Sequence, residues 1–332
     1  MDWSKGFSAS SHMMKVDPVT WADTERIEIT GGSVSRTISG LRQSADLDCT
    51  DFKPETECWI RVYLDASQSG DAAREALFTG LAAVSEENVD GELTTYPVDC
   101  YSVLKPAQDV LLERGFYIHS GTYCGQIFRD LLSVTPAPLK ITAETPKISG
   151  TIIAEGNETN LSMTEKVLSA IGWRMQISGD GTILIGPRDG AAKASFGVDN
   201  DVIEPKLTLR SDWFKCPNVF RAVSGDVTAI ARDDSRSSLL STVNRGREIW
   251  KEDGSVMLGN NEGLQQYAAR RLAEEQAYAY RIKYTRRFDP AVSVGDTVCL
   301  NYPAQGLIGE YTVTSQQISL GHGASVSEEV QR

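Results

Sequence analysis

The chain has 332 residues, of which 41% are hydrophobic and 23% are charged, an ordinary globular balance that excludes extensive disorder and allows two or three domains. No run of about 18 apolar residues occurs, so we expect no membrane span, and the N-terminus lacks the layout of a secretory signal. The net charge of −12, from 33 basic and 45 acidic residues, argues against a protein that binds the outside of nucleic acid.

Residues 1–104 are predicted to be mostly strands. Short segments in which apolar and polar residues alternate follow one another, and such spacing is typical of a small barrel or sandwich. Asp90-Gly91 predicts a hairpin turn. The predicted strands are Glu25–Thr30, Val34–Thr37, Ala45–Cys49, Trp59–Leu64, Leu77–Ala82 and Leu93–Tyr101.

Residues 105–205 change character and are predicted to form an α+β domain. Thr122–Ser133 has the periodicity of an amphipathic helix. Ser162-Met163-Thr164-Glu165 has the form of a capping box, so a second helix is expected to begin at Ser162. A hairpin should follow, with strands Trp173–Ile177 and Thr182–Ile185 and a turn at Gly179-Asp180-Gly181.

Residues 206–332 return to strands and contain one long helix, expected from about Asn261 to Ala279. A hairpin over residues 218–231 precedes this helix, and the strand Tyr280–Arg287 follows it. The chain then closes in a meander, in which Val298, Leu300 and Tyr302 form one alternating apolar set, and Tyr311, Val313 and Ser315 the next. The order β-rich, α+β, β-rich predicts a β-rich α+β protein in which two β domains flank a smaller α+β domain.

Metal and nucleophile chemistry find little support in the sequence. The cysteines form no C-x-x-C pair, so a zinc site is not expected, and we interpret them as small apolar residues of a protein made in a reducing cytosol. The three histidines (His12, His119 and His322) are interpreted as exposed loop residues, and no G-x-S-x-G elbow is present. The six cysteines are Cys49, Cys58, Cys100, Cys124, Cys216 and Cys299.

Charged motifs are equally uninformative about catalysis. Adjacent acids such as Glu86-Glu87 usually point apart, whereas a glycosidase needs two carboxylates that face each other. The turn at Gly179-Asp180-Gly181 leads into a strand and is therefore no phosphate-binding loop. We expect neither a cofactor nor an enzymatic activity. A basic series in the last third is interpreted as a solvated or subunit-contacting face; it comprises Arg245, Arg247, Arg270, Arg271, Arg286 and Arg287.

Several segments together resemble a known family. The helix at Gly263–Ala279, the strand after it, the V-S-V-G-D-T-V-C-L segment (Val292–Leu300), the strand Gly309–Val313 and the ending Gly321–Arg332 resemble the baseplate hub proteins of contractile phage tails and phage tail-like bacteriocins, the late control protein D-like tail hub family. In the N-terminal part, Ile27–Ser33, Leu47–Cys49 and Phe78–Gly80 also resemble that family.

The resemblance implies a structural role in a virion tail baseplate assembled in the host cytoplasm. Hubs of this family carry two tube-type β-barrels in one chain, which implies barrels in residues 1–104 and 206–332 around an α+β decoration in residues 105–205. Three copies would place six barrels around a channel and match a homotrimer to the six-fold tail tube. The implied partners are the tail tube protein, the central spike, the baseplate wedge proteins and the tape-measure protein.

The channel of such a ring would have to let DNA or tape-measure protein pass without specific binding. An acidic wall repels phosphate and keeps the surface hydrated. Two alternatives remain open from the sequence: a tail-associated component that binds or degrades the cell wall, and the hub of a non-contractile tail. The candidate channel-lining residues are Asp46, Asp48, Asp99, Asp296 and Glu310.

Overall fold

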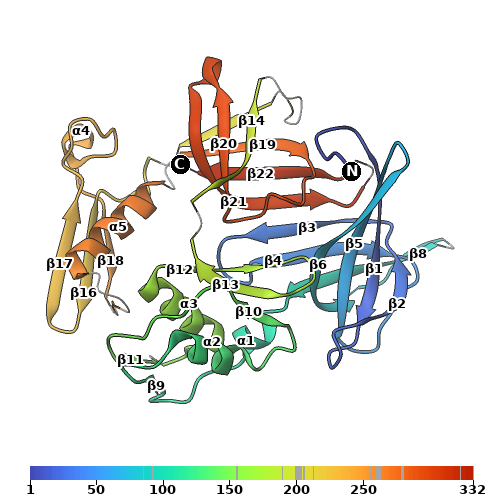
Figure 1. Ribbon diagram of the computed structural model, residues 1–332, viewed down its shortest axis with the longest axis horizontal. Helices are drawn as coiled ribbons and strands as arrows, with labels where there is room; N and C mark the ends of the chain where they lie inside the picture. The colour runs from blue at the N-terminus through green and yellow to red at the C-terminus, as the bar shows by residue number, and fades with distance from the viewer. Residues whose placement is uncertain are drawn as a thin grey trace.

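The computed structural model confirms a β-rich α+β fold, in which most elements are strands and the helices are few and short (Figure 1). In the described part of the chain, two large β modules share one sheet, and three small sheets lie outside it. The structure describes residues 1–84, 86–91, 93–154, 156–188, 190–198, 204, 206–211, 213–254, 256, 258, 263–277, 280–321 and 323–331.

The first β module follows the predicted alternation closely. The turn at Asp90-Gly91 joins two antiparallel strands, and Gly91 has a positive φ of 63°. An additional strand that the sequence analysis did not identify begins the module, because Ser8–Val16 alternates only weakly. The strands are β1 (Ser8–Val16), β2 (Asp23–Glu28), β3 (Gly31–Thr37), β4 (Gln43–Cys49), β5 (Cys58–Gln68), β6 (Asp71–Val84), β7 (Asn88–Asp90) and β8 (Leu93–Ser102).

The α+β module lies beside the first β module, below the shared sheet in Figure 1. Helix α2 (Cys124–Leu132) buries the apolar face that the sequence predicts, and helix α3 (Asn160–Ile171) packs against it. Strands β12 (Trp173–Ile177) and β13 (Ile183–Pro187) form the predicted hairpin. The remaining elements are α1 (Lys105–Asp109), β9 (Tyr117–Ile118), β10 (Leu139–Ile141) and β11 (Ile152–Ile153).

The turn of the β12–β13 hairpin docks the α+β module onto the first β module. The indole of Trp21 donates to the carbonyl of Asp180 at 3.0 Å, and the Thr79 hydroxyl donates to the carbonyl of Gly179 at 2.8 Å. A Cβ atom at position 179 would lie 1.6 Å from the carbonyl oxygen of Ala76, so only glycine permits this approach.

The second β module contains the closing meander. Strand β14 (Ala192–Gly197) pairs in parallel with β20 (Thr297–Tyr302), and β20 pairs with β21 (Leu307–Ser319). The other elements are β15 (Thr208–Ser211), β19 (Tyr280–Arg287), the 3-10 helix η1 (Pro303–Gln305) and β22 (Ser325–Gln331).

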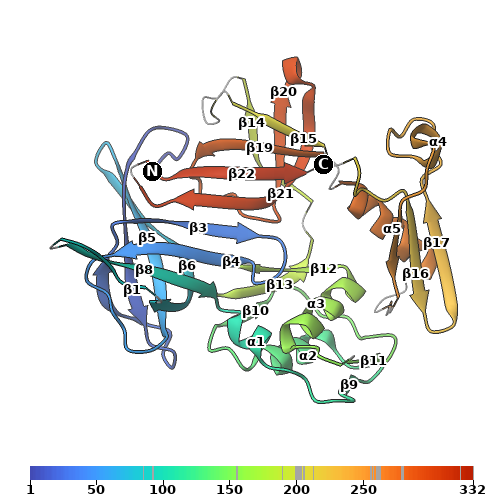
Figure 2. The same cartoon turned by 180° about the vertical axis from the view of Figure 1, so that it is seen from behind.

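A small separate unit stands to the side of the second β module in both views (Figures 1 and 2). Its three-stranded sheet, in the order β17-β16-β18, packs against helix α5 around a core of its own. The predicted ends of this helix, Asn261 and Ala279, lie outside the described residues. The unit comprises β16 (Val219–Ser224), β17 (Val227–Arg232), α4 (Thr242–Arg245), β18 (Trp250–Asp253) and α5 (Leu264–Ala277).

The two β modules are joined by direct strand pairing. Strand β21 pairs antiparallel with β3, from Ser315 opposite Thr37 to Ser319 opposite Ser33. One sheet therefore runs in the order β15-β19-β22-β21-β3-β4-β8-β6-β5-β1-β2 through both modules. The core of the first module also receives Ile318 and Val326 from the second, so the two modules share apolar packing as well as hydrogen bonds.

Two local predictions differ from the structure. Helix α3 is capped by Thr159 rather than Ser162: the Thr159 hydroxyl accepts from the Ser162 amide, and the Ser162 hydroxyl accepts from the Thr159 amide. The serine at the third helical position thus does what Glu or Gln usually does in a capping box. In β21, a register shift between Val313 and Ser315 moves the buried face to Thr314, so Ser315 does not continue the apolar set.

The division into three domains remains a prediction, and the strand pairing departs from it at two places. Strand β14 precedes the predicted boundary at residue 206, yet it pairs with β20 of the second β module. Strands β16, β17 and β18 follow that boundary, yet they belong to a separate sheet. Sequence spacing places strands along the chain but does not reveal which strands pair.

Candidate assembly surface

Short polar side chains cover the outward face of the shared sheet across the joint between the two β modules. In one cross-strand row, register pairs connect Thr285 to Ser327, Ser327 to Gln317, and Gln317 to Ser35. The row continues through Ser44 to Tyr101. None of these six side chains is buried, whereas their neighbours along each strand are mostly in the core. We call this surface the polar face.

The next row of the polar face carries negative charge. Ser319 lies opposite Ser33, Ser33 opposite Asp46, and Asp46 opposite Asp99. Both aspartates are exposed. Two carboxylates in directly opposed positions repel each other, and this pair therefore concentrates negative charge on the polar face.

The structure distributes the five predicted wall residues unevenly. Asp48 is exposed two residues after Asp46 on β4 and so lies on the same face. Glu310 is exposed on the first half of β21, opposite Cys299, in the arm of the second module that pairs with β20.

Asp296 does not occupy an outward strand position, and this prediction is corrected. It lies in the turn before β20 and is only 8% exposed. Its carboxylate accepts from the Ser293 amide at 2.9 Å and lies 3.6 Å from the guanidinium of Arg174. The turn at Gly295-Asp296 thus faces the α+β module, where Asp296 is the counter-charge of Arg174.

A buried charged network lies beneath the polar face. Arg286 and Glu328 are 1% and 0% exposed, and their side chains form an ion pair at 2.7 Å. The same carboxylate accepts from the amide of Gln316 and from the hydroxyl of Tyr284. Burial, together with the adjacent Glu328, raises the pKa of Tyr284 well above its ordinary value. The network ties β19, β22 and β21 together from the core side.

The predicted basic series therefore does not form one solvated face. Arg286 is in the core, and Arg270 and Arg271 lie on α5, where both pair with Glu274. Arg245 donates to the carbonyl oxygens of Cys216 and Trp213. The sequence does not show that these arginines lie in different parts of the fold, because their partners are set by the tertiary structure.

The histidines and cysteines were interpreted correctly only in part. His119 is exposed, whereas His12 is a buried residue of β1, 1% exposed, with its Nδ1 atom 2.8 Å from Asp65; the interpretation of His12 as a loop residue is wrong. His322 lies outside the described residues. All six cysteines are free thiols, four of them buried, and burial raises the pKa of Cys49 to about 12 and that of Cys124 to about 11.

The described residues contain no group of three or more His, Cys, Asp or Glu side chains placed to hold a metal ion. In the same part of the chain, every helix is too short or too polar to cross a membrane.

Serine pairs of the polar face are visible in the sequence, although the cross-strand rows that they form are not. Serines recur at every second position in Ser33–Ser35 and Ser325–Ser327, next to buried valines. The polar positions between buried residues of an alternating strand are therefore the signal for such a face.

Neither a protein-family model nor a curated protein matches the chain. Several solved structures are similar to the chain. The chain is similar to the 43 kDa tail protein of prophage MuSo2 from Shewanella oneidensis (TM-score 0.70, 14% identity, 98% of each chain covered). It is similar to a tail protein from Neisseria meningitidis MC58 (TM-score 0.70, 13% identity, covering 99% of this chain and 97% of that one). The prophage tail protein gp18 from Listeria monocytogenes EGD-e is also similar (TM-score 0.55, 12% identity, covering 97% and 94%). At these identities the likeness shows a shared fold over the whole chain.

Proposed function

We propose that the chain is a structural component of a phage or phage-like tail, and specifically the baseplate hub that joins the tail tube to the central spike. The observation that carries the proposal is the polar face, which runs without interruption from the second β module into the first. The fold shared with three phage tail proteins supports the same assignment.

In this proposal three copies form a closed ring. Each chain contributes two β modules already joined side by side through β21 and β3. A cyclic trimer repeats such a side-by-side arrangement and closes without free ends. Six modules around the axis match the six-fold symmetry implied for the tail tube, with the spike below and the wedge proteins outside.

The polar face would line the channel. Hydroxyl and amide groups keep a surface hydrated, and the carboxylates of Asp46, Asp48 and Asp99 repel the phosphates of passing DNA. Glu310 would extend the acidic wall from the arm formed by β20 and β21. The channel would thus let DNA or tape-measure protein pass without binding either, and this role requires no catalytic residue.

Mass measurement of the purified protein, alone and mixed with its tail tube protein, tests the hub assignment. We expect a species of three chains that is stabilised by the tube protein. A protein that stays monomeric alone and in every mixture would contradict the assignment. A turnover assay on peptidoglycan tests the wall-degrading alternative, for which we expect no release of fragments above that of buffer.

A further inference from the structure

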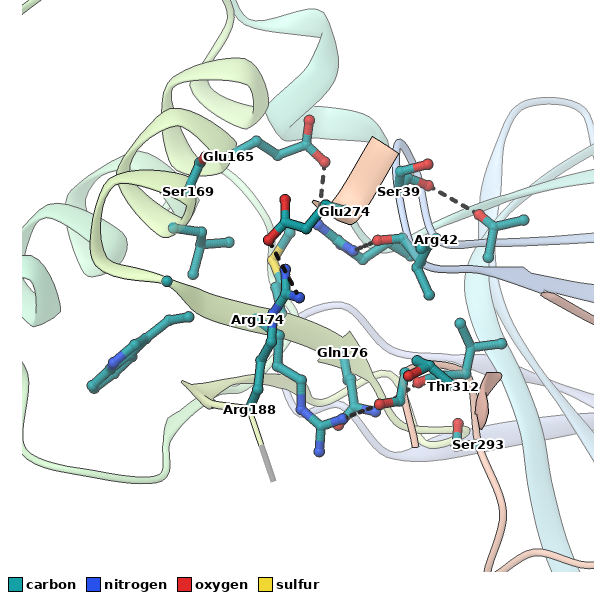
Figure 3. Close-up of a pocket in the computed structure, with 18 of the residues that line it drawn as sticks. Ser39, Arg42, Glu165, Ser169, Arg174, Gln176, Arg188, Glu274, Ser293 and Thr312 are labelled. Atoms are coloured by element: carbon teal, nitrogen blue, oxygen red, sulfur yellow. Dashed lines mark hydrogen bonds and ion pairs between the residues drawn. The ribbon is translucent and has the colours of Figure 1, made fainter. Parts of the chain in front are cut away.

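A cavity of about 630 Å³ lies where the two β modules, the α+β module and helix α5 meet (Figure 3). It is lined by the end of β3 and the loop after it, by α3 and β12, by α5, and by the turn before β20. Its volume falls in the range of pockets that hold small ligands. Segments that are distant in the sequence therefore enclose one space.

The cavity lining is basic, in contrast to the chain as a whole. The lining residues include six arginines and three glutamates, whereas the whole chain has 33 basic and 45 acidic residues. Asp296, which lies just outside the lining, forms an ion pair with Arg174. Among the lining residues that the structure describes, five arginines then remain for three glutamates. The arginines are Arg36, Arg42, Arg174, Arg188, Arg270 and Arg271, and the glutamates are Glu165, Glu274 and Glu275.

The two glutamates of α5 are each shared by more than one basic side chain. Glu274 lies 2.7 Å from Arg271, 3.0 Å from Arg270 and 3.8 Å from Arg188. Figure 3 shows Glu274 and Arg188 side by side at the cavity. Glu275 in turn lies 2.7 Å from Lys251 and 3.4 Å from Arg271. One carboxylate thus serves three guanidinium groups.

Buried polar atoms at the same cavity lack partners. Arg36 is 8% exposed; one of its terminal nitrogens donates to the carbonyl of Leu77, but its Nε has no partner. Gln43 is 4% exposed and its Oε1 is unpartnered, as are the Nε atoms of Arg42 and Arg271. Burial and the nearby Arg286 lower the pKa of Arg36 to about 10. A buried guanidinium without a carboxylate is costly, and a bound anion would offset that cost.

We propose that this cavity binds an oxyanion, either a free phosphate or a carboxylate group presented by an acidic segment of another protein. Guanidinium groups present paired N–H donors that match both groups, and such charge-assisted hydrogen bonds are the strong ones. The anion would bridge the α+β module and α5 at the place where the two β modules meet. The site is independent of the hub assignment, because it lies within one chain and needs no ring.

The test is thermal unfolding of the full chain, titrated with sodium phosphate and, separately, with a triglutamate peptide, against sodium chloride at matched ionic strength. We expect a saturable rise in Tm with at least one of the two probes, since a ligand that binds only the folded state stabilises it. Saturation by phosphate at lower concentration identifies a small-ion site, and saturation by the peptide at lower concentration identifies a docking site for an acidic segment.

Three variants separate the site from general ionic effects. Arg188→Gln should weaken the apparent affinity on the order of tenfold by removing a charge-assisted hydrogen bond. Arg221→Gln, at an exposed arginine paired with Glu252 outside the cavity lining, is the matched control and should change nothing. Glu274→Gln should strengthen binding, because it removes the carboxylate that competes for three arginines.

No saturable rise above that of chloride with either probe would overturn the proposal, and so would an Arg188→Gln variant that responds like Arg221→Gln. The test with Arg188→Gln does not depend on whether the Glu274→Gln variant folds. The Arg188 side chain is 64% exposed, so its replacement leaves the core intact.

Discussion

Single residues decide how the modules of this protein are held together. Gly179 is the clearest case, because the carbonyl of Ala76 occupies the place of a side chain. Gly179→Ala should destabilise the protein by about 1–3 kcal/mol, the usual cost of overpacking. Gly6→Ala, where a Cβ meets nothing within 4 Å, is the matched control. Urea unfolding measures both, and equal stability of the two variants would rule out the proposed docking role of the turn.

His12 makes a second prediction at this scale. Burial lowers the pKa of His12 below its ordinary 6.5, and Asp65 only partly opposes this. Below pH 6.5 the unfolded chain takes up a proton at His12 that the folded protein binds less readily, so stability is present above that pH and is lost as the pH falls.

The measurement compares the free energy of unfolding at pH 7.5 and pH 5.5 for the wild type and His12→Phe, which keeps a ring to stack on Tyr63. We expect the wild type to lose more stability than the variant between the two pH values. Identical losses would show that His12 does not carry the dependence.

At the scale of elements, the buried pair of Arg286 and Glu328 braces three strands of the second β module. Glu328→Gln leaves Arg286 as an uncompensated buried charge and should cost about 3–5 kcal/mol. The double variant Glu328→Gln with Arg286→Met removes that charge and should recover part of the loss. Chemical denaturation of both variants checks this. A double variant no more stable than Glu328→Gln alone would mean that the loss does not come from the unpaired guanidinium.

Individual elements could largely be predicted from the sequence, since alternation and helical periodicity are local. Strand β19 was predicted with its observed bounds, Tyr280–Arg287, and α2 within two residues at its start. The bulge after Val313 could not be predicted, because it depends on how β21 meets β22 and β3. The burial of Asp296 depends on Arg174, which is far away in the sequence and contacts it only in the folded chain.

At the scale of the whole molecule, strand partners could not be predicted from the sequence either, because pairing joins segments that are far apart in the chain. Nothing local to β14 indicates that it pairs with β20, about a hundred residues later. The joint between β21 and β3 is equally non-local, although it creates the polar face on which the proposed function depends. Acidic positions of that face could be predicted from alternation, whereas its rows of serines become visible only once the strands are set in register.

The most direct test of the hub assignment is a cryo-EM map of the ring formed by this protein with its tail tube protein. We predict three chains around a channel, with Ser35, Ser44, Asp46, Asp99 and Gln317 facing the lumen. A ring in which these side chains face outward or contact neighbouring subunits, with the channel lined by another surface, would contradict the account.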